Sequence, residues 1–164
     1  MDVKTAFLNS VIKEEVYIDQ PQGFEVEEKW TRICKLKKAM YGLKQDPRAW
    51  YGRIDSFLTS MGFTKSKVDP NLYFKVIDDE PVILLLYVDD LFLTGNEKQI
   101  KECKKKLAEE FEMKDLGLMH YFLGLEVWQS SEGIFLNQRK YAVEILKRFD
   151  ILECKSMATP MDVG

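Results

Sequence analysis

Several features that mark membrane, secreted or zinc-binding proteins are absent from the sequence. Its longest hydrophobic run is far shorter than the roughly 20 residues that a helix needs to cross a bilayer. The first ten residues contain an acid at position 2 and no long apolar segment, unlike a secretory signal. The cysteines Cys34, Cys103 and Cys154 are isolated and odd in number, which predicts neither a disulfide framework nor a zinc site. We therefore expect an intracellular protein in a reducing compartment, with no membrane partner.

An overall excess of positive charge is also lacking, because 24 basic and 27 acidic residues give a net charge of −3. This balance argues against a free-standing nucleic-acid binder. The segment between Lys29 and Arg53 is nevertheless strongly basic, with Asp46 as its single acid and with aromatic residues interleaved. Such a segment could follow a phosphate backbone or could form a solvated lysine-rich face, and the sequence leaves both interpretations open.

Length and composition predict a globular protein of modest size. A chain of 164 residues can bury a core and corresponds to one domain, or to one domain with an appendage. Hydrophobic residues make up 46% of it and charged residues 31%, which is ordinary for a globular protein. No internal repeat or low-complexity linker indicates a boundary between two full domains.

The sequence is organised around positions 82–95. An apolar run at 82–88 meets two adjacent carboxylates, Asp89 and Asp90, and then resumes as Leu-Phe-Leu-Thr-Gly. This pattern predicts a buried strand and a second short strand at 91–94, with the acid pair at the hairpin turn between them. Aspartate favours turns for its own reasons, because its side chain bonds nearby backbone amides. Alternatively, the pair binds a divalent metal, since unpaired charge beside a packed core is costly.

The remaining sequence predicts further strands and three amphipathic helices. Asp46 is expected to cap the first helix, with Pro47 at its first position and Gly62 after its end. Asn96 and Asn137 are expected to cap the other two. The apolar helix faces comprise Trp50, Ile54, Phe57, Leu58 and Met61, then Ile100, Cys103, Leu107 and Phe111, then Tyr141, Ile145, Leu146 and Phe149. Strands are expected at 1–8, 15–20, 31–36 and 71–77, and a second hairpin pairs 121–128 with 134–136.

The order strand, helix, strand, strand, helix, strand is the split βαβ, or ferredoxin-like, arrangement of an α+β fold. In this arrangement the first strand and the central hairpin are neighbours in one sheet, so Asp2 is expected beside Asp89. Together with Asp90, these carboxylates could converge, as a two-metal phosphoryl-transfer site requires. A receiver domain also carries acids after a buried strand. That alternative requires a helix directly after Asp90 and leaves the first 81 residues unexplained.

Six blocks of the sequence, in order, resemble the reverse transcriptase of Ty1/copia-type LTR retrotransposons, and the resemblance covers essentially the whole chain. A lone Tyr-Val-Asp-Asp is a weak signal, whereas the blocks together are highly specific. They are Met-Asp-Val-Lys-Thr-Ala-Phe-Leu-Asn at the start, Lys-Leu-Lys-Lys-Ala-Met-Tyr-Gly-Leu-Lys-Gln-Asp-Pro-Arg-Ala-Trp at 35–50, Tyr-Val-Asp-Asp at 87–90, Lys-Asp-Leu-Gly at 114–117, Tyr-Phe-Leu-Gly-Leu-Glu at 121–126, and Cys-Lys at 154–155 with Thr-Pro at 159–160.

The resemblance implies an RNA-directed DNA polymerase that adds deoxynucleoside triphosphates to a DNA primer on an RNA template. Its catalytic acids would be Asp2, Asp89 and Asp90, which would also hold two Mg²⁺ ions, with Mn²⁺ as a substitute. Phe7 matches the bulky residue that closes on the sugar 2′ position and favours deoxynucleotides. The implied nucleotide- and template-binding residues are Phe7, Gly42, Lys44, Gln45, Pro47 and Tyr87. The implied primer grip is Phe122, Leu123 and Gly124.

The resemblance further implies a polymerase palm with a primer-grip hairpin at residues 1–136, followed by the start of a helical thumb or connection at 137–164. One departure is Asp46, where the family usually has alanine. The fingers segment, the complete thumb and the RNase H region of the family have no counterpart in this sequence. We therefore expect the rest of a Pol polyprotein as a partner, and weak or absent activity from this chain alone. A catalytically inactive transposon relic is the alternative.

Overall fold

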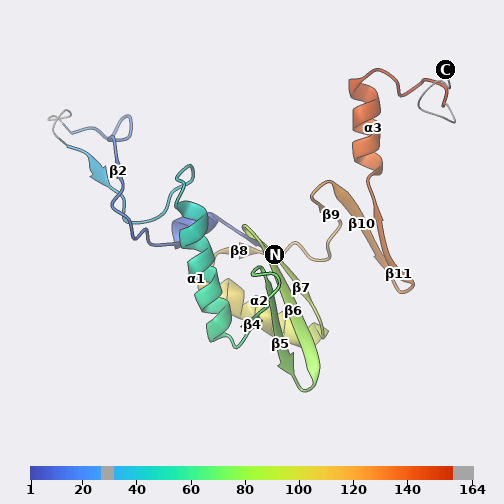
Figure 1. Ribbon diagram of the computed structural model, residues 1–164, viewed down its shortest axis with the longest axis horizontal. Coiled ribbons are helices and arrows are strands. Elements are labelled where there is room, and N and C mark those ends of the chain that lie inside the picture. The colour runs from blue at the N-terminus through green and yellow to red at the C-terminus, as the bar shows by residue number, and fades with distance from the viewer. Residues whose placement is uncertain (27–31, 157–164) are drawn as a thin grey trace. The chain divides into compact units, whose positions relative to one another are not determined.

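The computed structural model describes residues 1–26 and 32–156, which divide into two compact units, Met1–Leu116 and Gly117–Gly164 (Figure 1). Each unit is described by itself below. The start of the predicted strand at 31–36, Lys29 and Trp30 of the basic segment, and the Thr-Pro block at 159–160 lie outside the described residues.

The first unit is built on a six-stranded sheet whose paired strands are antiparallel, in the order β4-β5-β6-β7-β1-β8. A separate strand pair, β2 with β3, corresponds to the predicted strands at 15–20 and 31–36. The strands are β1 (Asp2–Val3), β2 (Tyr17–Ile18), β3 (Cys34–Lys35), β4 (Thr64–Lys65), β5 (Leu72–Ile77), β6 (Glu80–Tyr87), β7 (Asp90–Thr94) and β8 (Met113–Lys114).

Two helices, α1 (Asp46–Ser60) and α2 (Glu97–Glu110), provide one side of the core of this unit. The sheet provides the other side through alternate residues of β6, because successive side chains of a strand point to opposite faces. The buried cluster comprises Val3, Ala6, Trp50, Ile54, Leu58, Phe63, Tyr73, Val82, Leu84, Leu86, Leu91, Cys103, Leu107 and Phe111. Both helices occur where their apolar spacing predicts them, and Asn96 caps α2 by accepting a hydrogen bond from the Lys98 amide at 2.9 Å.

The first predicted strand is much shorter than expected. Residues 1–8 do not form one strand, because Thr5 adopts a left-handed backbone conformation (φ 48°) after β1. The chain then forms a 3₁₀ helix, η1 (Ala6–Asn9), in which Ala6 is buried. This turn carries Phe7 out of the sheet.

The second unit contains a three-stranded sheet, in the order β11-β10-β9, and one helix. Its elements are β9 (Tyr121–Phe122), β10 (Leu125–Ser130), β11 (Gly133–Asn137) and α3 (Arg139–Arg148). The predicted hairpin is confirmed, with Trp128 opposite Phe135. Residues 121–128 are not one strand, however, because the backbone turns at Leu123 (φ 47°) and Gly124 (φ 80°), so that β9 folds back on β10. The predicted capping of the last helix by Asn137 is wrong, because Gln138 is the residue directly before α3 and its side chain makes no capping hydrogen bond. Asn137 lies one position earlier, where its side chain accepts a hydrogen bond from the Arg139 amide at 3.1 Å.

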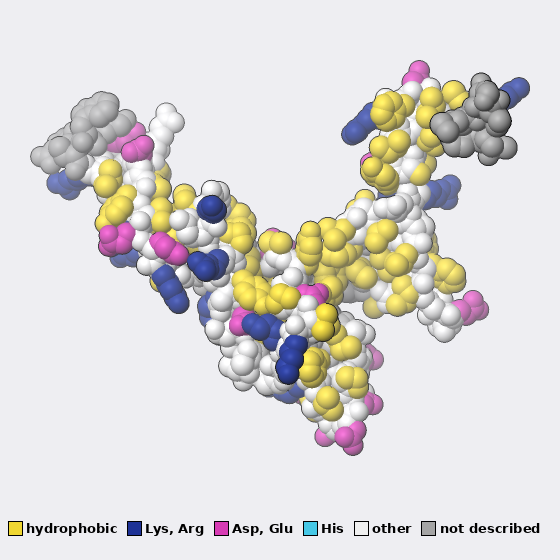
Figure 2. Space-filling view, in the orientation of Figure 1, with side chains coloured by type: hydrophobic (Ala, Val, Ile, Leu, Met, Phe, Trp, Pro, Cys, Tyr) yellow, Lys and Arg dark blue, Asp and Glu magenta, His cyan; other side chains and the backbone are white. Residues whose placement is uncertain are grey.

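The second unit buries few side chains. Among the described residues after 116, Val127 is the buried hydrophobic side chain, and α3 has none. Hydrophobic side chains are visible over the β10–β11 hairpin (Figure 2), where Trp128 is 67% exposed and Ile134 is 68% exposed. The predicted apolar face of α3 is therefore not part of a core.

The combination of helices with antiparallel sheets is compatible with the predicted α+β class. The division of the chain falls after Leu116, whereas the functional division at residue 136 stays a prediction. None of the helices in the described residues combines the length and apolarity needed to span a membrane. All three cysteines are free thiols. The receiver-domain alternative is wrong, because Asp90 begins a strand and not a helix.

Candidate active site

The predicted acids lie at one end of the β6–β7 hairpin. Val88 and Asp89 form its two-residue turn, and Asp90 is the first residue of β7. Asp90 is paired with Tyr87 on one side and with Asp2 of β1 on the other. Directly opposed residues of antiparallel strands present their side chains on the same face. Asp2 and Asp90 are therefore close neighbours although 88 positions separate them in the sequence.

Backbone hydrogen bonds fix β1 against the acid turn. The Val3 amide donates to the carbonyl of Asp89 at 2.9 Å, and the Leu91 amide donates to the carbonyl of Met1 at 2.8 Å. Val3 and Leu91 themselves are buried in the core. The expectation that the first strand and the central hairpin are neighbours is thus confirmed.

Charge accumulates at this end of the hairpin. The pKa of the Asp90 carboxyl is raised above its ordinary value, chiefly by partial burial and further by the negative charges of Asp89 and Asp2. Burial and nearby negative charges both disfavour the ionised form of a carboxyl. Within residues 1–26 and 32–156, however, no three His, Cys, Asp or Glu side chains surround a common point as metal ligands would.

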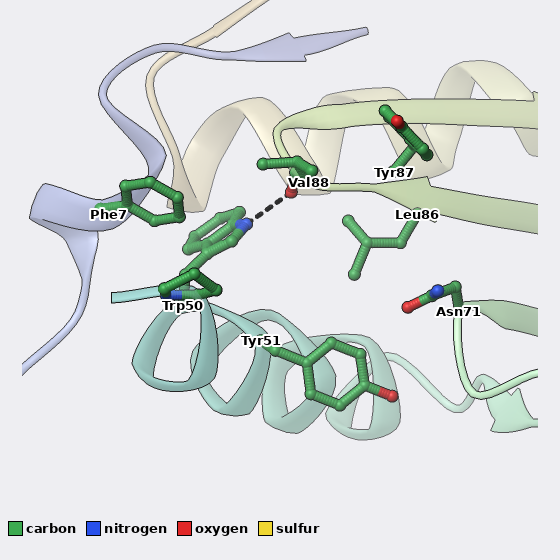
Figure 3. Close-up of a pocket in the computed structure, with 8 residues that line it drawn as sticks. Phe7, Trp50, Tyr51, Asn71, Leu86, Tyr87 and Val88 are labelled. Atoms are coloured by element: carbon green, nitrogen blue, oxygen red, sulfur yellow. Dashed lines mark hydrogen bonds between the residues drawn. The ribbon is translucent and has the colours of Figure 1, made fainter. Parts of the chain in front are cut away.

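Next to the acid turn is a cavity of about 230 Å³ (Figure 3). Its walls come from η1, from α1 and from the ends of β5 and β6. The lining residues are Phe7, Pro47, Trp50, Tyr51, Asn71, Leu86, Tyr87 and Val88. Three of the residues assigned to nucleotide or template binding by resemblance, Phe7, Pro47 and Tyr87, therefore meet in one cavity.

Sequence reasoning missed Tyr51 and Asn71 as cavity residues. Tyr51 counted only as one aromatic residue of the basic segment, and the β5 pattern gave no functional signal at Asn71. The Tyr51 hydroxyl donates to the carbonyl of Pro70 at 2.6 Å, which fixes the ring at the base of the cavity. Asn71 supplies a side-chain amide to an otherwise mostly apolar wall.

Phe7 is held in place by its neighbour across the fold. Its ring lies against that of Tyr41, with the ring centroids 4.6 Å apart and the planes tilted by 51°. Aromatic pairs at this separation attract each other beyond the area that they bury. The contact links η1 to the loop before α1, in which Gly42, Lys44 and Gln45 lie.

The role predicted for Asp46 as a helix cap is wrong. The residue is fully buried as the first residue of α1, and its carboxylate points back into the preceding loop. There it accepts hydrogen bonds from the amides of Met40 (3.1 Å) and Leu43 (2.9 Å). Pro47 consequently occupies the second helical position. Asp46 stabilises the loop and not the free amides of the helix.

The other assigned nucleotide-site residues lie in this loop and do not line the cavity. Gly42 has a left-handed backbone conformation (φ 104°), and open space surrounds it. Lys44 is exposed and Gln45 is half-buried. The loop could therefore present a cation and an amide to a ligand outside the cavity.

The basic segment is only partly available for phosphate. Lys35 forms an ion pair with Glu15, and Arg53 forms one with Glu110. These contacts join β3 to the region before β2, and α1 to the end of α2. Lys44 and Arg48 of the same segment are exposed near the start of α1.

The residues assigned to the primer grip belong to the second unit. Phe122 ends β9, while Leu123 and Gly124 form the turn to β10. Leu123 is 60% exposed at this turn. The three residues thus form the tip of a tight hairpin, and their role as a primer grip stays a prediction.

Comparison with known protein families matches residues 1–163 to a family described as reverse transcriptase (RNA-dependent DNA polymerase). No solved structure matches the chain. The match covers both units.

Individual relatives come from transposons. The chain is 44% identical to a retrovirus-related Pol polyprotein from transposon TNT 1-94 of Nicotiana tabacum, over 98% of the chain and 12% of the polyprotein. It is 39% identical to the corresponding polyprotein from transposon RE2 of Arabidopsis thaliana, over 98% of the chain and 11% of that relative. It is 38% identical to a transposon Ty5-1 protein of Saccharomyces cerevisiae, over 98% of the chain and 53% of that protein. The chain thus spans only part of the length of the relatives that it matches.

Proposed function

The chain belongs to the reverse transcriptase (RNA-dependent DNA polymerase) family, in its copia type, and we propose that it forms the catalytic palm of a retrotransposon Pol polyprotein. In this role it adds deoxynucleotides to a DNA primer on an RNA template. The observation that carries the proposal is the meeting of Asp2 and Asp90 across β1 and β7, beside the Asp89 turn and the cavity that contains Phe7.

The strand order supports a palm. Apart from η1 and β2–β5, which lie between them, the elements β1, α1, β6, β7, α2 and β8 occur along the chain as strand, helix, strand, strand, helix, strand. Their strands are neighbours in the order β6-β7-β1-β8. This is a split βαβ arrangement, in which the two central strands, β7 and β1, carry the acids. The second unit would supply the primer-grip hairpin and the start of the thumb.

The donor set at the acid turn fits a divalent metal. Carboxylate oxygens are the ligands that Mg²⁺ and Mn²⁺ prefer. The pKa of Asp90 is raised by partial burial and then by the charges of Asp89 and Asp2, and a bound cation would favour its ionised form. When bound by Asp2, Asp89 and Asp90, two such ions would activate the primer hydroxyl and offset charge on the triphosphate. The side chains themselves would orient the reacting groups by holding them at the end of a rigid hairpin.

The cavity residues are proposed to select and position the nucleotide. Phe7, fixed by Tyr41, would stand where a ribose 2′-hydroxyl would have to enter, so a deoxyribose is favoured. Pro47 and Tyr87 would contact the sugar or base through apolar surface. Gly42, Lys44 and Gln45 would approach the nucleotide or template from the loop. Phe122, Leu123 and Gly124 would hold the primer end.

Primer extension tests the proposal. The chain replaces the matching segment of the tobacco relative's polyprotein, and extension of a DNA primer on an RNA template is measured with Mg²⁺ and deoxynucleotides. The unaltered relative is the positive control. We expect extension by the chimaera that disappears with Asp89→Asn and persists with Asp79→Asn, a substitution at the opposite turn of the same strand. A chimaera that folds but extends no primer would support the inactive relic instead.

Primer extension by the isolated chain is a second test. We expect it to extend the primer weakly or not at all, because the relatives carry the chain as a small part of a longer Pol polyprotein. Full activity of the isolated chain would contradict that expectation while leaving the proposed function intact.

A further inference from the structure

The turn that carries Asp89 contains a strained residue. Val88 has a left-handed backbone conformation (φ 54°), and a β-branched side chain rarely adopts it. Two-residue hairpin turns in which the first central position alone has a positive φ normally have glycine there. Such strain persists only where the surrounding structure enforces it. Some contact must therefore hold the Val88–Asp89 turn.

Trp50 provides this contact. Its indole Nε1–H donates to the carbonyl of Val88 at 2.6 Å, across 38 positions of sequence (Figure 3). The ring is 2% exposed and cannot easily move. It packs edge-on against Phe111, with the ring centroids 5.4 Å apart. A buried indole has one polar atom, and here that atom is directed at the turn.

The position of this hydrogen bond bears directly on Asp89. The Val88 carbonyl belongs to the peptide group that joins Val88 to Asp89, so fixing its direction fixes the orientation of that whole plane. On the far side of Asp89, its own carbonyl accepts from the Val3 amide at 2.9 Å. The backbone of Asp89 is thus held from both sides, by a helix through Trp50 and by β1 through Val3.

We propose that Trp50 is a positioning residue, which holds the strained Val88–Asp89 turn and so fixes the backbone that carries the Asp89 carboxylate beside Asp2 and Asp90. Trp50 itself touches no reacting group in this account. The inference rests on the proposed function for the purpose of the positioning, but the coupling between Trp50 and Val88 does not depend on it.

Two substitutions separate positioning from simple packing. Trp50→Phe keeps an aromatic ring and removes the N–H donor. Val88→Gly removes the backbone strain, because glycine adopts a positive φ without a Cβ clash. Their double-mutant cycle is measured on the full 164-residue chain, by Mn²⁺ titration and by urea unfolding. Trp128→Phe, at an exposed position of β10, is the control for loss of an indole.

The expected result is non-additive. With Val88 present, Trp50→Phe weakens Mn²⁺ binding about tenfold, the equivalent of one hydrogen bond to the turn. In the Val88→Gly background, the same change weakens binding by less than about threefold, because the turn no longer needs to be held. Trp128→Phe leaves binding unchanged. A purely packing role for Trp50 predicts equal effects in both backgrounds, and that result would overturn the proposal.

Failure of the inference can be told apart from failure of the proposed function. If the unaltered chain binds no Mn²⁺ but the unfolding cycle still shows coupling, the proposed metal site fails and the role of Trp50 in the turn stands. If the cycle is additive in urea, the role of Trp50 fails.

If Trp50→Phe does not fold, the hydrogen-exchange rate of the Trp50 indole N–H, measured in the unaltered chain and in Val88→Gly, tests the proposal instead. The proposal expects slow exchange in the unaltered chain and faster exchange in Val88→Gly. Rapid exchange of this proton in the unaltered chain would contradict the hydrogen bond on which the inference depends.

Discussion

An acidic turn lies at each end of strand β6, and the two turns differ in how far their surroundings bury them. At one end Asp78 and Asp79, both exposed and both with positive φ (51° and 63°), connect β5 to β6. At the other end Asp89 and Asp90 are half-buried, and Asp2 lies opposite Asp90. Turn preference alone accounts for the first pair. The second pair has a neighbouring strand, a cavity and a buried indole around it, so its surroundings and not the doubled aspartate indicate a site.

The largest expected difference between the two ends lies in core packing. Leu91 follows Asp90 and is fully buried, whereas Val76 precedes Asp78 and is 61% exposed. Leu91→Ala should lower the free energy of unfolding by about 2–5 kcal/mol because it leaves a cavity. Val76→Ala should change it by less than about 0.5 kcal/mol. Urea unfolding measures both, and similar losses at the two positions would show that the ends are not distinct in packing.

At the end of β6 that carries Asp78, a close backbone contact requires a glycine. Gly95 directly follows β7 and has φ 142°, and a Cβ there would lie 2.6 Å from the Pro81 carbonyl oxygen. Gly95→Ala should therefore cost about 1–3 kcal/mol of stability, as strained backbone positions do. Gly133→Ala is the control, because Gly133 has a similar φ (151°) with open space around it. A loss at Gly133 as large as that at Gly95 would show that the close approach to Pro81 contributes nothing.

A third prediction concerns the loop before α1, which lies near the end of β6 that carries Asp89. Asp46→Ala removes the acceptor of the Met40 and Leu43 amides and should cost about 1–3 kcal/mol. Hydrogen exchange at these two amides should accelerate. The stability of Asp46→Asn should lie between that of the unaltered chain and that of Asp46→Ala, because asparagine has one acceptor oxygen where the carboxylate uses both. Unchanged exchange in Asp46→Ala would mean that the loop holds its shape without the carboxylate.

The smallest expected effect is electrostatic. Because the pKa of Asp90 is raised in the folded state, its ionisation opposes folding, and this cost appears as the pH rises through the folded pKa. Without metal, Asp90→Asn should therefore raise the melting temperature at pH 7. The gain should vanish below about pH 4, where the carboxyl is protonated in both states. Thermal melts in EDTA across this range test the sign, and a lower melting temperature at pH 7 would contradict it.

The sequence predicted most of the first unit because its periodic signals are strong. The apolar spacing of α1 and α2, the cap at Asn96 and the run at 82–88 all lead to the observed elements. Elements that depend on a local backbone reversal were missed, since neither Thr5 nor Leu123 belongs to a residue type that favours a positive φ. Both reversals broke predicted strands into shorter pieces.

The candidate site was only partly predictable. The pairing of Asp2 with the central hairpin followed from the order of elements, and Phe7, Pro47 and Tyr87 followed from the family resemblance. Asn71, the hydrogen bond from Trp50 and the inward orientation of Asp46 depend on contacts between distant segments, which no local pattern encodes.

The central claim is that the acid pair at Asp89, and not the one at Asp79, binds divalent metal. Titration of the chain with Mn²⁺, by calorimetry, tests it most directly when Asp89→Asn and Asp79→Asn are compared as single carboxylate losses at the two ends of β6. The account predicts that binding survives Asp79→Asn and is lost in Asp89→Asn. Equal binding by both variants would contradict it.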